Sequence, residues 1–418
     1  MNRELAVEQA YHAARAAYAA LGVDTDAALE RIAPVALSLH CWQGDDVRGF
    51  EPRPASLAGS GLWVGSGVPG RARNPEELRA DLDAAFALIP GRHRLNLHAM
   101  YGEFPHGLDR NRIAPEHYSG WLDWARGRVA GIDFNPTLFA HPLAESGATL
   151  SHADPAVRKF WVEHVKRSRK VAALLGRELG TPSVCNLWIP DGARDVALDR
   201  FARRTLLRDS LDEIYKRNYP DSELRDSLEG KLWGVGAEQF TVGSYDFYLG
   251  YALTRGRILC LDLGHFHPTE SVADKVSALL LFAPELLLHV SRPVRWDSDH
   301  IVTITDDLRE LFEEVVRADA LDRVRLALDY FDPGANRIGA WVSGARATLR
   351  CLLAALLQPA ERLRSTDRVE RLALLDELRT LPLGAVWDYH CLKSGVPPGL
   401  DWLEETRRYE LNVLSRRA

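Results

Sequence analysis

Paired cysteines, a basic excess and long apolar runs are all missing from this chain of 418 residues. The five cysteines (Cys41, Cys185, Cys260, Cys351 and Cys391) are scattered and include no Cys-x-x-Cys pair, so we expect free, mostly buried thiols in a reducing compartment. The net charge is -6, which argues against nucleic acid or an anionic membrane as a partner, because both bind concentrated Lys and Arg. A neutral or metal-bound small molecule fits better.

No run reaches the roughly 18 apolar residues of a membrane span. The longest, 278–290, is interrupted by Pro284 and Glu285, and residues 1–21 have a charged, Ala-rich helical pattern without the apolar core of a signal peptide. We therefore expect a cytoplasmic protein. The apolar and charged fractions, 46% and 26%, are those of a globular chain, long enough for one large barrel with an extension or for two ordinary domains.

Eight strand-like runs alternate with segments of helical periodicity. The runs are 35–41, 94–100, 131–134, 183–189, 223–229, 258–263, 286–290 and 324–329, and the helical segments include 74–89, 115–128, 155–179, 196–217 and 271–281. Strict alternation predicts a parallel sheet, and eight repeats predict a closed (β/α)8 barrel. We expect this barrel, with an N-terminal helix, over residues 1–335, and a helical extension over 336–418 that makes subunit contacts.

A polar or aromatic residue lies at or near the C-terminal end of each run. These residues are His40, His98, Asn135, Trp188, Glu229, Asp262, His289 and Asp329. In a barrel such ends converge on one mouth, where active sites are built, whereas a doubly wound sheet would gather only the residues beside its switch point. The pattern therefore favours a barrel with its site at this mouth.

The spacing of carboxylates and imidazoles predicts a metal site. Asp297-x-Asp299 places both carboxylates on one face of an extended segment, and Asp with His suits a borderline divalent ion such as Mn, Co or Zn. One ligand set would be Glu229, Asp262, His289 and Asp329, and a second would be His265, Asp297 and Asp299 with Asp262 shared. Five carboxylates in one mouth cannot all stay ionised without compensation, which two divalent ions would supply.

Plainer interpretations exist for single residues. A lone Asp at a strand end can be a helix cap, and a lone His after three leucines is more often a core histidine. The register of His289 with Asp262 and Asp329 favours a ligand instead. His267 lies two residues after His265, and we expect it to contact the substrate or the ligands from outside.

Three further residues suit a sugar-like substrate. Lys231 follows Glu229 by two positions, so both would point into the mouth, where a Lys can hydrogen-bond a substrate oxygen or help move a proton. An ordinary loop lysine is the alternative. His98 would add a donor and Trp188 an apolar wall, as a polyol with one hydrophobic face requires, although packing alone also explains a Trp at a strand end.

Two patterns are set aside. Residues 65–70 match G-x-G-x-x-G, but no strand precedes them and Pro69 interrupts the turn-to-helix geometry that a dinucleotide site requires. We interpret the pairs Arg407-Arg408 and Arg416-Arg417 as solvated helix faces.

Longer motifs are more specific. They are residues 40–46 (HCWQGDD), 94–99 (RLNLHA), 150–154 (LSHAD), 188–192 (WIPDG), 264–270 (GHFHPTE) and 289–300 (HVSRPVRWDSDH). On these motifs the chain resembles the L-rhamnose isomerases over essentially its whole length. The resemblance implies a homotetrameric (β/α)8 enzyme that interconverts L-rhamnose and L-rhamnulose, with Mn or a similar divalent ion at two sites per subunit.

The resemblance also implies roles for single residues. It places a structural metal on Glu229, Asp262, His289 and Asp329, and a catalytic metal on His265, Asp297 and Asp299, with Asp262 nearby. We assign Lys231, His98 and Asp329 to catalysis. The expected sugar contacts are His98, Trp188, Trp42, Phe134 and His267. By analogy hydrogen moves between C1 and C2 as a hydride, which favours a dry site, and Trp188, Trp42 and Phe134 would help to exclude water.

Two other functions compete with the isomerase. A barrel metallohydrolase, such as an endonuclease, would act on an anionic substrate, which the acidic chain and its five-carboxylate mouth disfavour. A metal-stabilised sugar-binding protein would bind sugar without exchanging aldose and ketose.

Overall fold

The computed structural model describes residues 3–51, 68, 70–194, 196–231, 239–267, 269–294 and 299–417. Eight parallel strands close into a barrel in the order β1-β12-β9-β8-β6-β4-β3-β2. They are β1 (Leu37–His40), β2 (Arg94–His98), β3 (Gly131–Asn135), β4 (Ser183–Leu187), β6 (Leu224–Glu229), β8 (Ile258–Asp262), β9 (Leu286–Val290) and β12 (Val324–Leu328). The predicted (β/α)8 barrel is confirmed, and each predicted run overlaps one barrel strand.

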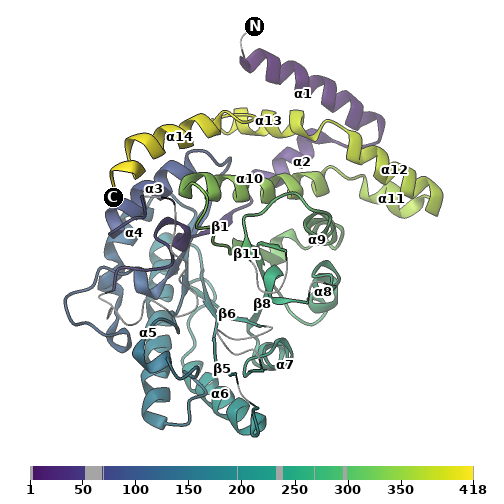
Figure 1. Ribbon diagram of the computed structural model, residues 1–418. Helices are drawn as coiled ribbons and strands as arrows, with labels where there is room; N and C mark the ends of the chain where they lie inside the picture. The colour runs from purple at the N-terminus through teal and green to yellow at the C-terminus, as the bar shows by residue number, and fades with distance from the viewer. Residues whose placement is uncertain are drawn as a thin grey trace.

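One helix follows each barrel strand, and Figure 1 shows these helices as a ring around the strands. They are α3 (Pro75–Phe86), α4 (Ser119–Ala125), α5 (Pro155–Leu179), α6 (Arg200–Ile214), α7 (Tyr245–Arg255), α8 (Ala273–Leu280), α9 (Asp306–Arg317) and α10 (Arg337–Leu356). Two short antiparallel sheets of two strands lie outside the barrel, β5 (Gly192–Ala193) with β7 (Phe240–Thr241) and β10 (Arg292–Pro293) with β11 (Asp299–His300). Among the described helices, none combines the length and the apolar character needed to span a membrane.

Local sequence explains these elements. β9 is buried at every position because helices cover the outside of the barrel and side chains fill its inside, so the strand is apolar at every position except His289. At the start of α5, Pro155 occupies the first turn and the Asp154 carboxylate accepts a hydrogen bond from the Ala156 amide at 2.8 Å. Gly180 ends the same helix with a φ of 69°, in the left-handed region that favours glycine.

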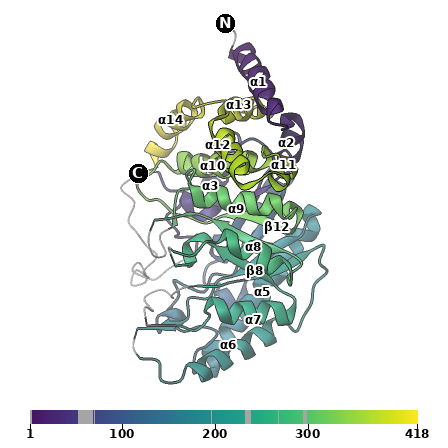
Figure 2. The same cartoon turned by 90° about the vertical axis from the view of Figure 1, so that its right-hand side faces the viewer.

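Further helices pack beyond α10, on one side of the barrel (Figures 1 and 2). They are α1 (Arg3–Ala20), α2 (Thr25–Ile32), α11 (Ala360–Ser365), α12 (Arg368–Thr380), α13 (Leu383–Lys393) and α14 (Trp402–Asn412). The stacked rings of Tyr11 and Tyr389, 3.9 Å apart, join α1 to α13. Because α10 packs against α2, α3 and α9, the eighth helix of the ring begins after residue 335. The division at residues 335 and 336 and the role of the extension in subunit contacts stay predictions.

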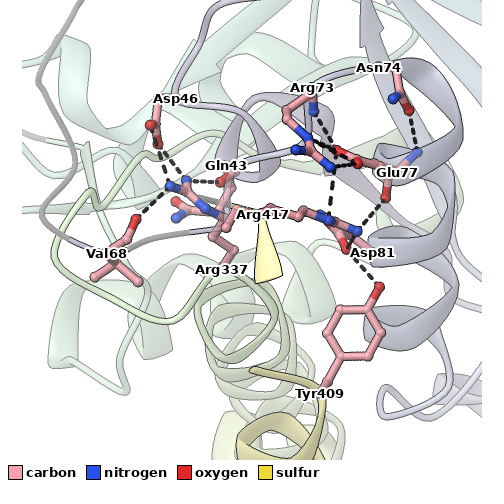
Figure 3. A network of polar contacts seen from close by, with 11 residues as sticks. Gln43, Asp46, Val68, Arg73, Asn74, Glu77, Asp81, Arg337, Tyr409 and Arg417 are labelled. Carbon is pink, nitrogen blue, oxygen red and sulfur yellow. Dashed lines mark hydrogen bonds and ion pairs between the residues drawn. The ribbon is translucent and has the colours of Figure 1, made fainter. Parts of the chain in front are cut away.

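Arg417 corrects one sequence interpretation. It is only 8% exposed, and its guanidinium makes two hydrogen bonds to the Asp81 carboxylate, at 2.6 and 2.9 Å (Figure 3). Tyr409 donates to the same carboxylate at 2.7 Å. The C-terminal segment is therefore tied to α3 by a bidentate ion pair, and Arg417 is not on a solvated face. The five cysteines are free and buried, as predicted.

Candidate metal centre

Four side chains with metal-binding atoms meet at the mouth of the barrel. Glu229 ends β6, Asp262 ends β8, His289 lies one residue before the end of β9, and Asp329 follows β12. These strands are neighbours in the barrel, and one ligand atom from each residue lies within 4.8 Å of all the others. Strand register explains the convergence, because Asp262 pairs with His289 and the Asp329 amide donates to the carbonyl of Val290 at 3.2 Å.

His289 lies at the centre of this cluster. Its Nδ1 is 3.3 Å from Glu229 Oε2, 3.4 Å from Asp262 Oδ2 and 3.1 Å from Asp329 Oδ2. Both ring nitrogens of His289 and Asp262 Oδ2 are buried without a hydrogen bond. Buried polar atoms in native proteins nearly always have a partner, and mixed carboxylate and imidazole donors are those that Mn, Co and Zn take. The four side chains therefore fit a divalent cation.

The electrostatics of the cluster agree with this fit. Burial alone would raise the pKa of Glu229, but the imidazoles of His289 and His265 hold it well below its usual value. Burial alone would lower the pKa of His289, but its interactions with Cys260, Glu229, Asp262 and Asp329 raise it well above its usual value. Burial raises the pKa of Asp329 to about 6. The carboxylates of Glu229, Asp262 and Asp329 thus surround the His289 imidazole with negative charge, which favours a positive charge at the centre of the cluster.

The structure describes only part of the second predicted set of metal ligands. His265 Nδ1 lies 3.0 Å from Glu229 Oε1 and 3.1 Å from the carbonyl of Gly230, so the structure places this imidazole beside the first cluster. The Gly264 amide donates to Asp262 Oδ1 at 2.7 Å and holds the carboxylate that the two sets would share. Asp297 lies outside the described residues, and only the backbone of Asp299 is described, in the β10–β11 hairpin.

An arc of rings lines the mouth beside the cluster. Trp42 meets His98 with ring centres 5.0 Å apart, His98 meets Phe139 at 5.6 Å, and Phe139 meets Trp188 at 5.7 Å. We call these four residues the aromatic wall. The Lys231 ammonium lies 4.1 Å from the centre of the Trp188 ring, a cation–π contact, and the lysine is only 4% exposed. Lys231 and three of the four wall residues were predicted at the mouth from the sequence.

The electrostatic state of His98 is set by its surroundings. Burial and the charge of Arg110 lower the pKa of its imidazole to about 3, and Nδ1 lies 3.1 Å from the Thr137 hydroxyl. A neutral imidazole has one N–H and one lone pair. His98 can therefore make one further hydrogen bond to a polar ligand in the mouth, as donor or as acceptor according to its tautomer.

One predicted sugar contact, Phe134, lies elsewhere. Phe134 is in β3 directly before Asn135, which faces the inside of the barrel and bonds Asn96. Because side chains alternate along a strand, Phe134 faces outward, where it packs on Tyr118 with ring centres 5.1 Å apart. The structure therefore does not bring Phe134 to the mouth, and Phe139 occupies the wall instead. His267 bonds Thr269 within its own loop, Nδ1 lying 2.7 Å from the Thr269 hydroxyl.

Sequence reasoning missed two residues of the site. Asn186 is 2% exposed, and its side-chain amide donates to Glu229 Oε2 at 2.6 Å, which fixes the direction of that carboxylate. Its position two residues before Trp188, where an extended chain points both side chains the same way, is a signal that could have revealed it. Phe139 lies in a loop after β3, where no periodicity predicts which way a side chain points.

Comparison with known proteins gives the family to which this chain belongs. The family model for L-rhamnose isomerase (RhaA) matches residues 5–417. An L-rhamnose isomerase of Rhodopirellula baltica is 53% identical over 422 residues, covering 100% of this chain and 99% of that protein. One from Pectobacterium carotovorum is 52% identical, covering 98% and 99%. Among solved structures, an L-ribulose 3-epimerase aligns over 80% of this chain and 99% of its own, with 14% identity and a TM-score of 0.45. The full-length match to the family model and to relatives more than half identical shows that the chain belongs to the L-rhamnose isomerase family.

Proposed function

We propose that this protein interconverts L-rhamnose and L-rhamnulose with two bound divalent cations. Mn²⁺ is the expected cation, and Co²⁺ or Zn²⁺ are alternatives. The observation that carries the proposal is the cluster of Glu229, Asp262, His289 and Asp329 at the mouth of a closed barrel. Family membership supplies the sugar, because relatives that are more than half identical are named L-rhamnose isomerases.

The four clustered side chains would hold one cation, and His265, Asp297 and Asp299 would hold the second, with Asp262 shared. A bound divalent cation supplies Lewis-acid chemistry, which polarises adjacent oxygens of a sugar. Asp329 is the most exposed of the four clustered ligands, its side chain 24% exposed, so it is the one that a sugar in the mouth can reach. For this reason we keep it among the residues that act in catalysis.

The reaction exchanges one hydrogen and one proton. In the direction from aldose to ketose, the hydrogen on C2 moves to C1 with its electron pair, and the proton on O2 moves to O1. Lys231 carries a buried ammonium beside the cluster, and in our proposal it donates to the sugar oxygen on which negative charge develops. His98, neutral in its half-buried position, bonds a sugar hydroxyl and orients the ring or the open chain.

A hydride shift also requires that water stay away from the reacting carbons. Trp42 is 6% exposed, and Trp42, Phe139 and Trp188 form a nearly continuous apolar surface around His98. A sugar with one hydrophobic face would pack on this wall, which displaces water from C1 and C2. The wall therefore supports a hydride route over an exchange of protons with solvent.

The test follows L-rhamnose by NMR with protein stripped of metal by a chelator, before and after Mn²⁺ is restored. We expect ketose only after restoration. Full turnover by metal-free protein would refute the metal role. Sugar binding without any ketose would identify a sugar-binding protein, and cleavage of a phosphodiester by Mn²⁺-loaded protein would identify a hydrolase.

The homotetramer and the cytoplasmic location belong to the same proposal. Sedimentation equilibrium of the full chain measures the first, and fractionation of the source cells measures the second. A monomer in solution would contradict the proposed tetramer.

A further inference from the structure

Gln43 joins two segments at the mouth that are far apart in the sequence. Its side chain is 0% exposed, its amide nitrogen donates to the Asp332 carbonyl at 2.9 Å, and its amide oxygen accepts from the Asp332 amide at 2.9 Å. One side chain thus pairs with both backbone groups of one residue, as a neighbouring strand would. Gln43 directly follows Trp42 of the aromatic wall, and Asp332 lies three residues after the proposed ligand Asp329.

Arg337, the first residue of α10, contacts the turn formed by residues 41–47, which contains Gln43. Its guanidinium donates to the Gln43 carbonyl at 3.3 Å and to the carbonyl of Val68 at 3.0 Å, and it forms an ion pair with Asp46 (Figure 3). Arg337 and Asp46 are 1% and 3% exposed. A buried, multiply bonded guanidinium fixes position as well as charge, since its planar donors have set directions.

The backbone beside this ion pair is in an unfavourable conformation. Asp46 and Val47 have φ angles of 62° and 58°, and a β-branched residue rarely adopts the left-handed region. The Val47 amide closes the turn by donating to the Trp42 carbonyl at 3.1 Å. Such strain persists only where the surroundings determine the conformation, and it gathers at functional sites. Here Arg337 supplies that constraint.

Packing leaves no free space beside Gly44 in this turn. A Cβ added at Gly44 would lie 2.4 Å from the Leu78 side chain and 2.8 Å from the Trp341 ring. The Trp341 indole also donates to the His40 carbonyl at 2.7 Å. The 41–47 turn is therefore held in place by its packing on Leu78 and Trp341 and by the hydrogen bonds of Gln43 and Arg337. Trp42 is the residue of this turn that reaches the mouth.

We propose that Gln43 and Arg337 are positioning residues that hold Trp42 and Asp329 in a fixed relation. The inference rests on the proposed function, because Trp42 is there a wall of the sugar site and Asp329 a ligand of the metal. Loosening the link at Asp332 displaces both, so metal binding and sugar binding weaken together. A link that served stability alone would leave both unchanged in the folded protein.

The experiment compares Gln43→Met, which keeps the length of the side chain and removes both hydrogen bonds, with Tyr409→Phe. The control removes one hydrogen bond, from Tyr409 to Asp81, at the junction of α14 and α3 (Figure 3). Each protein is stripped of metal and titrated with Mn²⁺ by calorimetry. The KM and kcat for L-rhamnose are then measured at saturating Mn²⁺, together with Tm.

We expect Gln43→Met to raise the Mn²⁺ dissociation constant and the KM each by about tenfold, the loss typical of groups that orient ligands. In Tyr409→Phe only Tm should fall. Values for Gln43→Met within twofold of the control would overturn the inference. If the unmodified protein neither binds Mn²⁺ nor forms ketose, the proposed function fails instead, so the two failures are distinguishable.

A second variant keeps the test decisive if Gln43→Met does not fold. Gln43→Glu accepts from the Asp332 amide but can donate to the Asp332 carbonyl only when its carboxyl is protonated. Its KM, divided by that of the unmodified protein at the same pH, should therefore fall as pH decreases from about 8 to 6, because burial raises the pKa of a carboxyl. A ratio that is independent of pH and near one would contradict the positioning role.

Discussion

Replacing Asn186 by Leu should weaken Mn²⁺ binding with little effect on the fold. The Asn186 amide donates to Glu229 Oε2 at 2.6 Å, and the other amide atom, Oδ1, is buried without a partner. Leu has a similar volume and removes both polar atoms, so it deletes a useful hydrogen bond and an unsatisfied oxygen together. Only the bond to the proposed ligand is functionally important.

The magnitude follows from the charge of the acceptor. A hydrogen bond to an ionised group contributes about 1.5 to 3 kcal/mol, and each 1.4 kcal/mol changes an equilibrium constant about tenfold. If the bond serves to orient Glu229 for the cation, its loss raises the Mn²⁺ dissociation constant about 10- to 100-fold. Enough Mn²⁺ should restore most of kcat, because Asn186 does not itself contact the sugar in our proposal.

The assay is calorimetric titration of metal-stripped protein with Mn²⁺. Ser210→Ala is a matched control, since the Ser210 hydroxyl donates to the carbonyl of Leu150 at 2.7 Å in a buried position on α6. The control should lose stability but keep its affinity for Mn²⁺. A dissociation constant for Asn186→Leu within twofold of the control would refute the reasoning that this bond orients a metal ligand.

Three other predictions follow from the same structure. Lys231→Met should lower kcat for L-rhamnose by about 100-fold and leave the Mn²⁺ affinity within a few-fold, because the ammonium acts on the sugar. If kinetics and calorimetry show equal losses of kcat and of Mn²⁺ affinity, Lys231 is a structural residue instead. L-rhamnose with deuterium on C2 should give ketose that keeps deuterium on C1, as NMR can measure, whereas washout into water would indicate an enediol route. Burial lowers the pKa of His93 to about 4, and Leu37 donates to its Nδ1, so the folded state binds this proton less readily than the unfolded state. Stability is then lost as pH falls from about 6.5 to 4, by up to about 3 kcal/mol from this residue, and urea unfolding of His93→Gln should show a smaller loss over that range.

The architecture of the barrel was predictable because its signals are local. Alternating apolar runs and helical segments marked all eight strands, and His289, at the end of a leucine run, matched Asp262 and Asp329 by register. The positions of these strands and of the polar residues at their ends follow from the periodicity of the sequence and the order of its segments alone. The ligand cluster was therefore predicted residue by residue before any distance was known.

Other parts of the site depend on packing between distant segments. The orientation of Phe134 required the exact register of β3, and the aromatic partner that takes its place, Phe139, lies in a loop without periodicity. The buried Arg417 looked like a surface residue because the acid that binds it, Asp81, is more than 300 residues away in the sequence. The Gln43 link is hidden from sequence reasoning for the same reason.

The most direct test of the metal centre is a crystal structure of Mn²⁺-loaded protein with anomalous data collected at the Mn edge. We predict a strong anomalous peak among the carboxylates of Glu229, Asp262 and Asp329 and the imidazole of His289. If the crystallised protein is active with Mn²⁺ but shows no peak among these four side chains, or shows Mn²⁺ bound only elsewhere, the account is contradicted.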